Sequence, residues 1–549
     1  MSETPKKIDP LLRVKNLSVT FQTDDRIVNA VNDVSFEVNP GEVLGLVGES
    51  GSGKTVTGMS ILRLVPTPPG HYDSGEILFE GEDILKMRPE ELRRIRGSRI
   101  SAIFQEPMTA LSPLKTVGNQ LKELLDIHHP DWSKKQKLDK VIEWLDKVGI
   151  PDAANRRHQF PFQFSGGMRQ RVTIAMALML EPRLVIADEP TTALDVTLQA
   201  QVFDLMMKMK ADKTSLIFIT HDMGVVWELS DRVLVMKDAK LVEEGPVESL
   251  FGTPREEYTR KLLNAVPRLD DVPVRTNHTF PQTPILEAAD LQTWFPVKGG
   301  LLSRTTGHVK AVDGVSLQIR EGETLGVVGE SGSGKSTLGR TLIGLEYATG
   351  GGVFYEDRPI QNLRGAQWQP IRRQVQMIFQ DPYSSLNGRL KILDLLSEAP
   401  VVHGLIPKTD PDYVANCLEE VGLKAEMMYR YPHEFSGGQR QRICIARALA
   451  LKPKIIICDE AVSALDVTIQ AQILDLLMEL RERHGLAYLF ISHDLSVVKR
   501  ICDHVLVMRQ GQVVEEGPPS QVVDNPRHEY TQKLLAAVPS PGDPNRRRR

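Results

Sequence analysis

Two glycine-rich segments of this sequence have the residue types that can hold a chain of phosphates. One runs from Gly48 to Thr55 and the other from Gly329 to Ser336, and both read Gly-Glu-Ser-Gly-Ser-Gly-Lys before a hydroxyl residue. Glycine lets the backbone approach phosphates with its N–H groups pointing inward, and the N-terminus of a following helix adds partial positive charge. Each segment follows an apolar, strand-like run and precedes a plausible helix, so both are predicted to be P-loops.

The two P-loops predict that the chain binds ATP and Mg²⁺. Lys54 and Lys335 are expected to reach the β- and γ-phosphates, while the hydroxyl groups of Thr55 and Ser336 are expected to ligate the metal ion. The residues predicted to cradle the phosphates are Gly48, Ser50, Gly51, Ser52, Gly53, Lys54 and Thr55 in the first loop and Gly329, Ser331, Gly332, Ser333, Gly334, Lys335 and Ser336 in the second.

Two Asp-Glu pairs follow buried-looking apolar runs. Asp188 and Glu189 come directly after the run 184–187, and Asp459 with Glu460 holds the same place in the second half. Ligands of parallel α/β sheets sit at the carboxyl ends of the strands. The aspartates are therefore predicted to hold the Mg²⁺ shell, and the glutamates to position or deprotonate the attacking water. A single pair of this kind is usually a solvated loop, but two pairs, each downstream of a P-loop, favour catalysis.

The two halves of the chain are copies of one domain. The offset between them is 335 − 54 = 281 residues at the P-loop lysines and 493 − 221 = 272 at a later histidine, and the motifs keep their order. Strand-like and helix-like segments alternate in each copy, which indicates an α/β fold with a mainly parallel sheet. The predicted parts are a tail at 1–10, a nucleotide-binding domain at 11–266, a proline-rich linker at 267–284, a second such domain at 285–538 and a Pro/Arg-rich tail at 539–549.

Composition restricts the class of protein. With 41% hydrophobic and 25% charged residues the chain has the balance of a soluble globular protein, and its net charge of −4 gives no surplus for binding nucleic acid. No apolar run reaches the roughly 18 to 20 residues of a membrane span, and residues 1–10 show no secretory signal. The four cysteines form no CxxC pair, which fits a reducing cytosol. The arginines at 546–549 are interpreted as a solvated tail.

A third repeated motif carries a family resemblance. Ser165-Gly-Gly-Met-Arg-Gln and Ser436-Gly-Gly-Gln-Arg-Gln, each upstream of an Asp-Glu pair, resemble the signature loop of the ATP-binding-cassette (ABC) family. The resemblance implies that each cassette has an antiparallel β subdomain and an α-helical signature subdomain. It also implies a head-to-tail dimer within the chain, in which each signature loop closes over the other cassette's ATP. The residues implied to contact that ATP are Ser165, Gly166, Gly167, Ser436, Gly437 and Gly438.

Further positions match motifs of the same family. Gln105 and Gln380 look like the Q-loop glutamine, which implies a contact to Mg²⁺ and coupling to membrane subunits. His221 and His493 resemble the switch histidine that contacts the γ-phosphate. An isolated histidine after a strand is usually structural, but the ordered series of motifs favours the switch role.

Two more pairs are carried over by position. Asp195 and Asp466 resemble the D-loop aspartate of the dimer interface, and Phe21 and Phe295 hold the place of the adenine-stacking aromatic residue. An early aromatic residue belongs to a hydrophobic core about as often, so that alternative stays open. The second copy departs from the first at Ala461, where the first copy has a proline.

Both copies keep the catalytic glutamate, so both sites are expected to hydrolyse ATP. The composite sites implied by the resemblance pair Lys54 and Glu189 with Ser436, and pair the equivalent residues of the second copy with Ser165.

Within the family, the chain resembles the ATPase subunits of dipeptide, oligopeptide and nickel importers. The segments 104–108 and 187–197 carry this likeness, together with a Tyr-Thr-x-Lys-Leu-Leu sequence near the end of each copy. The nearest likeness is to the fused subunits of glutathione and microcin C-type peptide importers. It implies two membrane permeases and an external binding protein as partners, a peripheral place at the cytoplasmic face of the inner membrane, and no nucleic acid.

Several alternatives stay open at this stage. Peptides are the favoured substrate class, with opine-like compounds and nickel as alternatives for the same ATPase role. Some relatives carry an iron–sulfur centre on C-terminal cysteines, but neither the segment 267–284 nor 539–549 contains a cysteine, so none is expected here. A soluble paired-cassette translation factor is the rival from another class. Such factors have a long helical linker, whereas 267–284 is short and contains four prolines.

Overall fold

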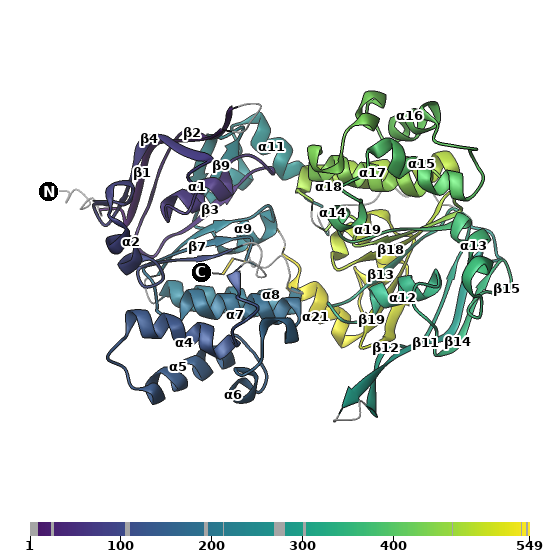
Figure 1. Ribbon diagram of the computed structural model, residues 1–549, viewed down its shortest axis with the longest axis horizontal. Coiled ribbons are helices and arrows are strands. Elements are labelled where there is room, and N and C mark those ends of the chain that lie inside the picture. The colour runs from purple at the N-terminus through teal and green to yellow at the C-terminus, as the bar shows by residue number, and fades with distance from the viewer. Residues whose placement is uncertain are drawn as a thin grey trace. The chain divides into compact units, whose positions relative to one another are not determined.

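The structure is a computed structural model that describes all residues except 1–8, 23–26, 105–109, 191–195, 212–213, 268, 270–279, 300–303, 464, 540, 545–546 and 549. Internal contacts divide the chain into two units, which are a first unit of residues 1–266 with 539–549 and a second unit of residues 267–538. Figure 1 shows that each unit combines β-sheets with covering helices.

The first unit contains an antiparallel sheet of order β2-β1-β4-β5 and a larger sheet of order β10-β9-β3-β8-β7-β6, in which only the β9–β10 pair is antiparallel. The strands are β1 (Leu12–Gln22), β2 (Ile27–Val38), β3 (Val43–Val47), β4 (Gly70–Phe79), β5 (Glu82–Asp83), β6 (Ile100–Ile103), β7 (Leu184–Asp188), β8 (Ser215–Ile219), β9 (Arg232–Lys237) and β10 (Lys240–Pro246).

The helices of the first unit pack around the larger sheet, and some of them form a helical region beside it. They are α1 (Lys54–Ile61), α2 (Pro89–Ile95), α4 (Val117–His128), α5 (Lys134–Lys147), α6 (Ala153–Arg156), α7 (Gly166–Leu178), α8 (Val196–Ala211), α9 (Met223–Leu229), α10 (Val247–Gly252) and α11 (Glu257–Asn264).

The second unit repeats this arrangement with sheets of order β12-β11-β14-β15 and β16-β17-β18-β13-β19-β20. Its strands are β11 (Leu286–Gly299), β12 (Arg304–Ile319), β13 (Thr324–Val328), β14 (Gly350–Tyr355), β15 (Arg358–Pro359), β16 (Val375–Ile378), β17 (Ile455–Asp459), β18 (Ala487–Ser492), β19 (His504–Arg509) and β20 (Gln512–Gly517).

The helices of the second unit follow the same order along the chain. They are α12 (Lys335–Leu342), α13 (Gln369–Gln374), α14 (Pro382–Ser385), α15 (Ile392–Val402), α16 (Pro411–Glu420), α17 (Gly437–Leu449), α18 (Val467–His484), α19 (Leu495–Ile501), α20 (Pro519–Val522) and α21 (Glu529–Ala537).

The central strands of each larger sheet are buried along their whole length. All five residues of β3, β7 and β8 are buried, as are those of β13 and β17. Parallel strands covered by helices on both faces need apolar side chains on both faces, which explains their continuous Val, Ile and Leu runs. The predicted α/β class, the duplication and the mainly parallel sheet are therefore confirmed.

The helical regions have cores of their own. In the first unit, Leu121 and Leu125 of α4 meet Val141, Trp144 and Leu145 of α5 in one cluster of buried side chains. Their i, i+3 and i+4 spacing forms the apolar stripe expected of helices that pack on one face. The helical region thus packs through α4 and α5 beside α7, the helix that follows the first signature motif.

The interpretation of the C-terminal arginines as a solvated tail is wrong for two of them. Residues 539–549 group with the first unit, and only 10% of the Arg547 side chain and 27% of the Arg548 side chain are exposed. Both guanidinium groups have carboxylate and carbonyl partners, which a run of four arginines does not reveal by itself. Most of the predicted linker lies outside the described residues.

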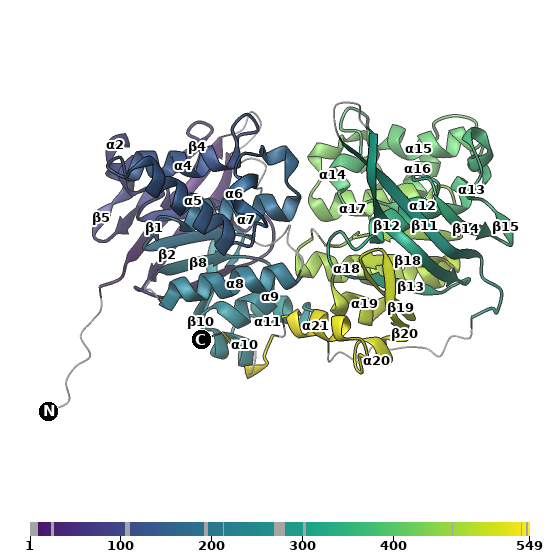
Figure 2. The same cartoon turned by 90° about the horizontal axis from the view of Figure 1, so that it is seen from below.

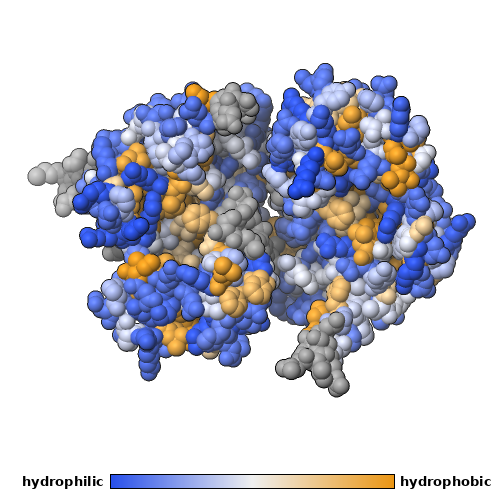
Figure 3. Space-filling view, in the orientation of Figure 1, coloured by the Kyte–Doolittle hydropathy of each residue, from blue (hydrophilic) through white to orange (hydrophobic). Residues whose placement is uncertain are grey.

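On the face drawn in Figure 3, hydrophobic residues form small separate patches within a mainly hydrophilic surface. Among the helices in the described ranges, none is both long and apolar enough to cross a bilayer.

Candidate nucleotide site

The glycine-rich segments form tight loops between a buried strand and a helix. Gly48 follows β3 with a φ of +150°, and a Cβ atom there would lie 2.2 Å from the Met236 carbonyl oxygen. Gly329 follows β13 with a φ of +153°, and its Cβ would lie 2.2 Å from the Met508 carbonyl oxygen. Only glycine fits these two positions, because a neighbouring strand approaches them so closely.

Each loop folds around its own lysine. The Lys54 ammonium donates to the carbonyl oxygens of Gly48 at 2.7 Å and Glu49 at 2.8 Å. The Lys335 ammonium donates to Gly329 and Glu330, both at 2.8 Å. Both lysine side chains are buried at the N-terminus of a helix, so two sources of positive charge meet at the centre of each loop.

A hydroxyl group and a carboxylate meet beside each lysine. Ser336 Oγ donates to Asp459 Oδ1 at 2.8 Å, and Thr55 makes the equivalent hydrogen bond to Asp188. Burial raises the pKa of Asp188 to about 6, the charge of Glu189 adds to the rise, and the Thr55 hydrogen bond opposes it. Burial likewise raises the pKa of Asp459. Each carboxylate therefore lies where a cation would stabilise its charged form.

These oxygens fit Mg²⁺. Oδ1 of Asp188 is buried without a hydrogen-bond partner, so it has a free lone pair directed into the site. In the described part of the chain, no group of three or more His, Cys, Asp and Glu side chains forms a metal cage. Mg²⁺ is instead commonly bound by one hydroxyl and one carboxylate of the protein, and the phosphates of the substrate supply further ligands.

The glutamates next to these aspartates have a strained backbone. Glu189 has a φ of +46° and Glu460 a φ of +48°, a region that non-glycine residues rarely adopt. Their N–H groups donate to the carbonyl oxygens of Ile219 at 2.9 Å and Ile491 at 3.0 Å, which fixes the turn at the end of the strand. Strain of this kind persists only where the surroundings hold it, and it is concentrated at functional sites.

A histidine faces each of these glutamates. His221 Nδ1 lies 3.0 Å from Glu189 Oε1, and His493 Nδ1 lies 3.5 Å from Glu460 Oε2. Gln380 Nε2 also donates to Glu460 Oε2, at 2.8 Å. The structure therefore brings together three of the predicted catalytic residues of the second unit.

The Glu460–His493 pair favours its charged form. Burial raises the pKa of Glu460, but the hydrogen bond and positive charge of His493 outweigh it, so the net shift is downward. Burial lowers the pKa of His493, but the hydrogen bond and charge of Glu460 outweigh it, so the net shift is upward. Glu460 is thus held as a carboxylate that can accept a proton or a hydrogen bond.

The signature serines begin the helices that follow them. Ser165 Oγ accepts from the Met168 N–H at 3.3 Å at the start of α7, and Ser436 Oγ accepts from the Gln439 N–H at 3.4 Å at the start of α17. Gly166, Gly167, Gly437 and Gly438 form the first turns, whose free N–H groups suit an anion. The pairing of each signature loop with the other unit's P-loop stays a prediction.

The remaining predicted residues are distributed as follows. Phe21 of β1 is partly buried against the core of the first unit, whereas Phe295 of β11 is 38% exposed. Asp466 stands directly before α18. Gln105 and Asp195 lie outside the described residues.

Two tyrosines in the site were not predicted. The Glu49 N–H donates to Tyr258 Oη at 3.1 Å, and the Glu330 N–H donates to Tyr530 Oη at 3.0 Å. Both tyrosines belong to the repeated Glu-Tyr-Thr segments near the end of each copy, and that repetition was the available signal. Because Glu49 and Glu330 belong to the P-loops, the tyrosines support the loops that are predicted to hold the phosphates.

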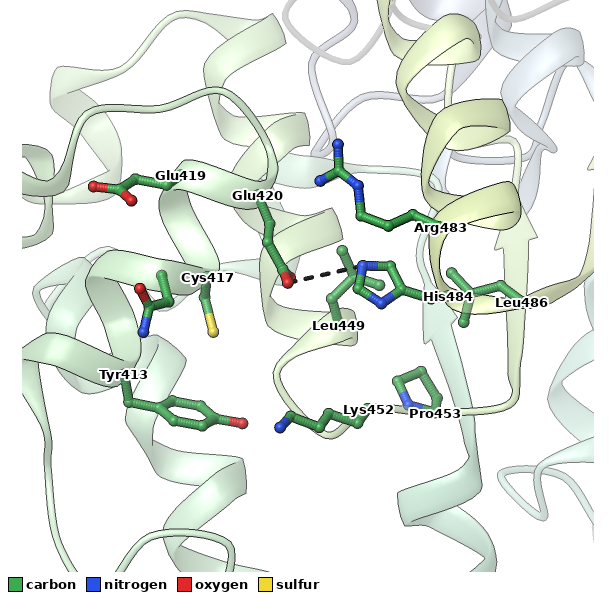
Figure 4. Close-up of a pocket in the computed structure, with 11 residues that line it drawn as sticks. Tyr413, Cys417, Glu419, Glu420, Leu449, Lys452, Pro453, Arg483, His484 and Leu486 are labelled. Carbon is green, nitrogen blue, oxygen red and sulfur yellow. Dashed lines mark ion pairs between the residues drawn. The ribbon is translucent and has the colours of Figure 1, made fainter.

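A cavity of about 800 Å³ in the second unit is separate from this site. It is lined by residues of α16, the end of α17 and the end of α18, where Glu420 lies 3.8 Å from His484 (Figure 4). None of its lining residues belongs to a P-loop, an Asp-Glu pair or a signature motif. Burial raises the pKa of Cys417 at its wall to about 11, so this thiol stays protonated and unreactive.

Two family models match this chain, and each of them matches two segments. The model described as "ABC transporter" matches residues 31–192 and 312–463. The model described as "Oligopeptide/dipeptide transporter, C-terminal region" matches residues 242–290 and 514–549.

Individual proteins match over nearly the full length. The chain is 48% identical to the peptidoglycan transport ATP-binding protein YejF of Agrobacterium fabrum, over 98% of each chain. It is 47% identical to the glutathione import ATP-binding protein GsiA of Escherichia coli K12, over 98% of this chain and 91% of that protein. Among solved structures, the dimeric cassette MJ0796 bound to ADP and Pi is 27% identical, with a TM-score of 0.40, and covers 43% of this chain and 98% of its own.

Proposed function

This chain belongs to the ABC transporter family as an ATP-hydrolysing protein with two cassettes, and we propose that it drives the import of peptides through membrane permeases. The observation that carries the proposal is the match over nearly the full length to relatives named for peptidoglycan transport and glutathione import. From here on, residues 1–266 are called the first cassette and residues 267–538 the second cassette.

ATP binding is assigned to the P-loops. Backbone N–H groups of residues 48–55 and 329–336 surround the phosphates, and the ammonium groups of Lys54 and Lys335 exchange their loop carbonyl partners for phosphate oxygens. Thr55 with Asp188, and Ser336 with Asp459, would hold Mg²⁺. When bound, Mg²⁺ neutralises charge on the phosphate oxygens.

Hydrolysis is assigned to the Glu-His pairs. Glu189 and Glu460 accept a hydrogen bond from the attacking water, so that its oxygen is directed at the γ-phosphorus and its proton has an acceptor. His221 and His493 hold the glutamates in place and present an N–H to the γ-phosphate. Gln380 fixes the second glutamate through its amide, and Gln105 is proposed to do the same in the first cassette.

Coupling to transport requires that the cassettes close on one another. The proposed composite sites place Ser436 over the ATP of the first P-loop and Ser165 over that of the second. Two bound ATP molecules then favour the closed arrangement of the cassettes, and hydrolysis allows it to open again. The pair of cassettes is thus a two-state element whose equilibrium is shifted by its ligand.

An apolar groove next to the Q-loop segment supports docking of a permease. It encloses about 230 Å³ in the first cassette and is lined by Leu64, Phe104, Leu124 and Met176, among others. Leu64 is 37% exposed, and Phe104 directly precedes Gln105. A groove between the sheet and the helical region, lined by Phe104 and Ala110 that precede and follow the Q-loop in sequence, suits a short amphipathic helix of a membrane subunit.

The finer assignments are a peripheral position at the cytoplasmic face of the inner membrane, a binding protein as a third partner, and no iron–sulfur centre. Opine-like compounds or nickel are the alternative substrates for the same ATPase role.

Reconstitution with the permeases and a binding protein tests this function. ATP hydrolysis is measured with and without glutathione and short peptides, with the double variant Glu189→Gln/Glu460→Gln as the inactive control. Stimulation by a peptide ligand is expected. Hydrolysis that no peptide changes, but that an opine or nickel stimulates, would replace the peptide assignment and leave the ATPase assignment intact.

A further inference from the structure

The last residues of the chain lie against the first cassette. Trp227 Nε1 donates to the Asp543 carbonyl oxygen at 2.8 Å, and the Arg548 N–H donates to the Glu228 carbonyl oxygen at 2.9 Å. Figure 2 shows this end of the chain, in yellow, beside α10. The tail is therefore attached through its backbone to α9, the helix that begins two residues after His221.

Arg547 occupies the C-terminal end of α9. Its Nη1 donates to the carbonyl oxygens of Trp227 and Ser230, both at 2.6 Å, and its Nη2 lies 3.3 Å from Glu248 Oε1 of α10. Its guanidinium carbon lies 5.6 Å from the centre of the Trp227 ring. The last carbonyl groups of a helix lack partners within the helix and carry partial negative charge, so a nine-tenths buried guanidinium suits this place.

Arg548 connects α9 to α8. Its Nε lies 3.3 Å from Oε2 of Glu228, whose side chain is only 6% exposed. Its Nη1 lies 2.5 Å from Asp204 Oδ1 and donates to the Ala200 carbonyl oxygen at 3.0 Å. A buried glutamate requires a cation or hydrogen-bond donors nearby, and the tail provides one for Glu228.

The tail also covers the first turn of α9. A Cβ atom on Gly224 would lie 2.5 Å from Pro539 Cβ, so the glycine allows the tail to pass closely. Asp222 Oδ1 accepts from the N–H groups of Gly224 and Val225, which places the start of the helix directly after His221. Contacts of the tail thus reach both ends of α9.

The equivalent helix of the second cassette cannot bind the same tail. With the offset of 272 residues between His221 and His493, the places of Trp227 and Glu228 are taken by Lys499 and Arg500. Lys499 is paired with Asp524 at 2.6 Å and Arg500 with Asp475 at 2.6 Å. Two cations would repel the tail arginines, so the binding site is a property of the first cassette alone.

We infer that α8, α9 and α10 of the first cassette form a binding site for the chain's own C-terminal Arg547-Arg548 segment, and that this contact positions His221. The first part stands on the contacts above. The second part rests on the proposed role of His221 and follows from geometry, because the tail is bonded to the C-terminal end of the helix that continues from this histidine and passes close to its first turn. Arg547 and Arg548 are positioning residues, since they touch neither ATP nor the reacting atoms.

Hydrogen exchange tests the binding site in the full chain. In Arg547→Ala/Arg548→Ala, amides of 223–229 are expected to exchange at least about fivefold faster, since their opening is no longer opposed by the tail. Amides of 495–501 are expected to stay unchanged and serve as the internal control. Unchanged exchange of 223–229 would overturn the inference.

A substitution at the exposed partner Asp204 provides the second variant, so that folding is not at risk. Asp204→Arg sets a second cation against Arg548 and is expected to speed exchange of 223–229, whereas Asp204→Glu keeps the carboxylate and is expected to preserve protection. Unchanged exchange in Asp204→Arg would show that the contact between these two side chains does not hold the tail on α9.

Kinetics test the positioning of His221. Arg547→Ala/Arg548→Ala is expected to lower kcat for ATP about threefold or more with KM for ATP unchanged, and to have no added effect in His221→Ala, because both changes act on one group. In His493→Ala the effect of the tail variant is expected to remain. An added loss in His221→Ala would overturn the positioning role. Failure of the proposed role of His221 is recognised separately, since His221→Ala alone would then leave kcat unchanged.

Discussion

The two cassettes agree closely at the P-loops and the Asp-Glu pairs, and they differ in the helix that follows the histidine. Both P-loop lysines donate to two loop carbonyl oxygens, both aspartates receive a hydroxyl group, and both glutamates adopt a positive φ next to a histidine. In contrast, the helix after that histidine carries Trp227 and Glu228 in the first cassette but Lys499 and Arg500 in the second. The two copies therefore share the arrangement of the predicted nucleotide site, while the helix that contacts the tail in the first copy differs in the second.

The largest effect is expected at the glutamates. Glu189→Gln and Glu460→Gln should each lower kcat by about 10²- to 10⁴-fold, because an amide cannot accept the proton of the attacking water. ATP affinity should stay unchanged, since the carboxylates face the water and not the adenine or the α-phosphate. Steady-state turnover and equilibrium ATP binding measure the two effects, with the exposed Glu426→Gln as control. Near-normal turnover in either variant would break the equivalence of the two sites.

The next effect concerns the P-loop backbone. In Gly48→Ala and Gly329→Ala the new methyl group would meet a carbonyl oxygen 2.2 Å away, so the loop must move. We expect a cost of about 3 kcal/mol, which corresponds to a factor of about 100 in ATP affinity.

Gly51→Ala and Gly332→Ala are the matched controls for this change. Both glycines also have a positive φ, +79° and +80°, but their Cβ atoms would meet nothing within 4 Å. Only a backbone cost of about 1 to 2 kcal/mol is then expected. Titration of ATP by calorimetry compares the four variants. Equal affinities in all four would mean that the neighbouring strand does not constrain the loop.

Combined substitutions test which signature loop completes which ATP site. If Ser436 completes the site of Glu189, then Ser436→Ala should lower turnover about tenfold or more by removing one donor to the reacting phosphate. It should add nothing in Glu189→Gln but should lower turnover further in Glu460→Gln, where it affects the other site. Turnover of these variants, with Ser165→Ala as the mirror-image set, decides the pairing. The opposite pattern would place each signature loop over the ATP of its own cassette.

The smallest effect is expected at the tyrosines behind the P-loops. Tyr258→Phe and Tyr530→Phe remove the acceptor for the Glu49 and Glu330 N–H groups. Loss of one such hydrogen bond is worth about 0.5 to 1.5 kcal/mol, so KM for ATP should rise about two- to tenfold. Equal rises in KM would show that the two tyrosines support their P-loops equally. An unchanged KM in both variants would show that neither tyrosine supports its P-loop. The exposed Tyr429→Phe is the control.

The P-loops and Asp-Glu pairs could be predicted because their chemistry is local. The strained glutamates are adjacent in sequence to the aspartates that end β7 and β17, and each lysine bonds carbonyl oxygens five and six residues away. The support by Tyr258 could not be predicted in the same way, because the hydrogen bond spans 209 residues. The repeated Glu-Tyr-Thr segment drew attention to this region, but the identity of the P-loop residue that Tyr258 contacts depended on the fold.

The C-terminal arginines are a case in which the local sequence pattern was misleading. Sequence alone presents Arg547 and Arg548 as part of a charged run, and such runs are usually solvated. Both are instead bound, because the fold directs Glu228, Asp204 and the carbonyl groups of Trp227 and Ser230 toward one place.

The sequence by itself determined the duplication, the α/β class, the phosphate-binding loops and the paired carboxylates, because each depends on spacing within a few residues. Only the tertiary structure decided which distant groups meet them: the histidine opposite each glutamate, the tyrosine behind each P-loop and the tail on α9. Contacts across hundreds of residues are set by how sheets and helices pack, and a linear pattern does not record that packing.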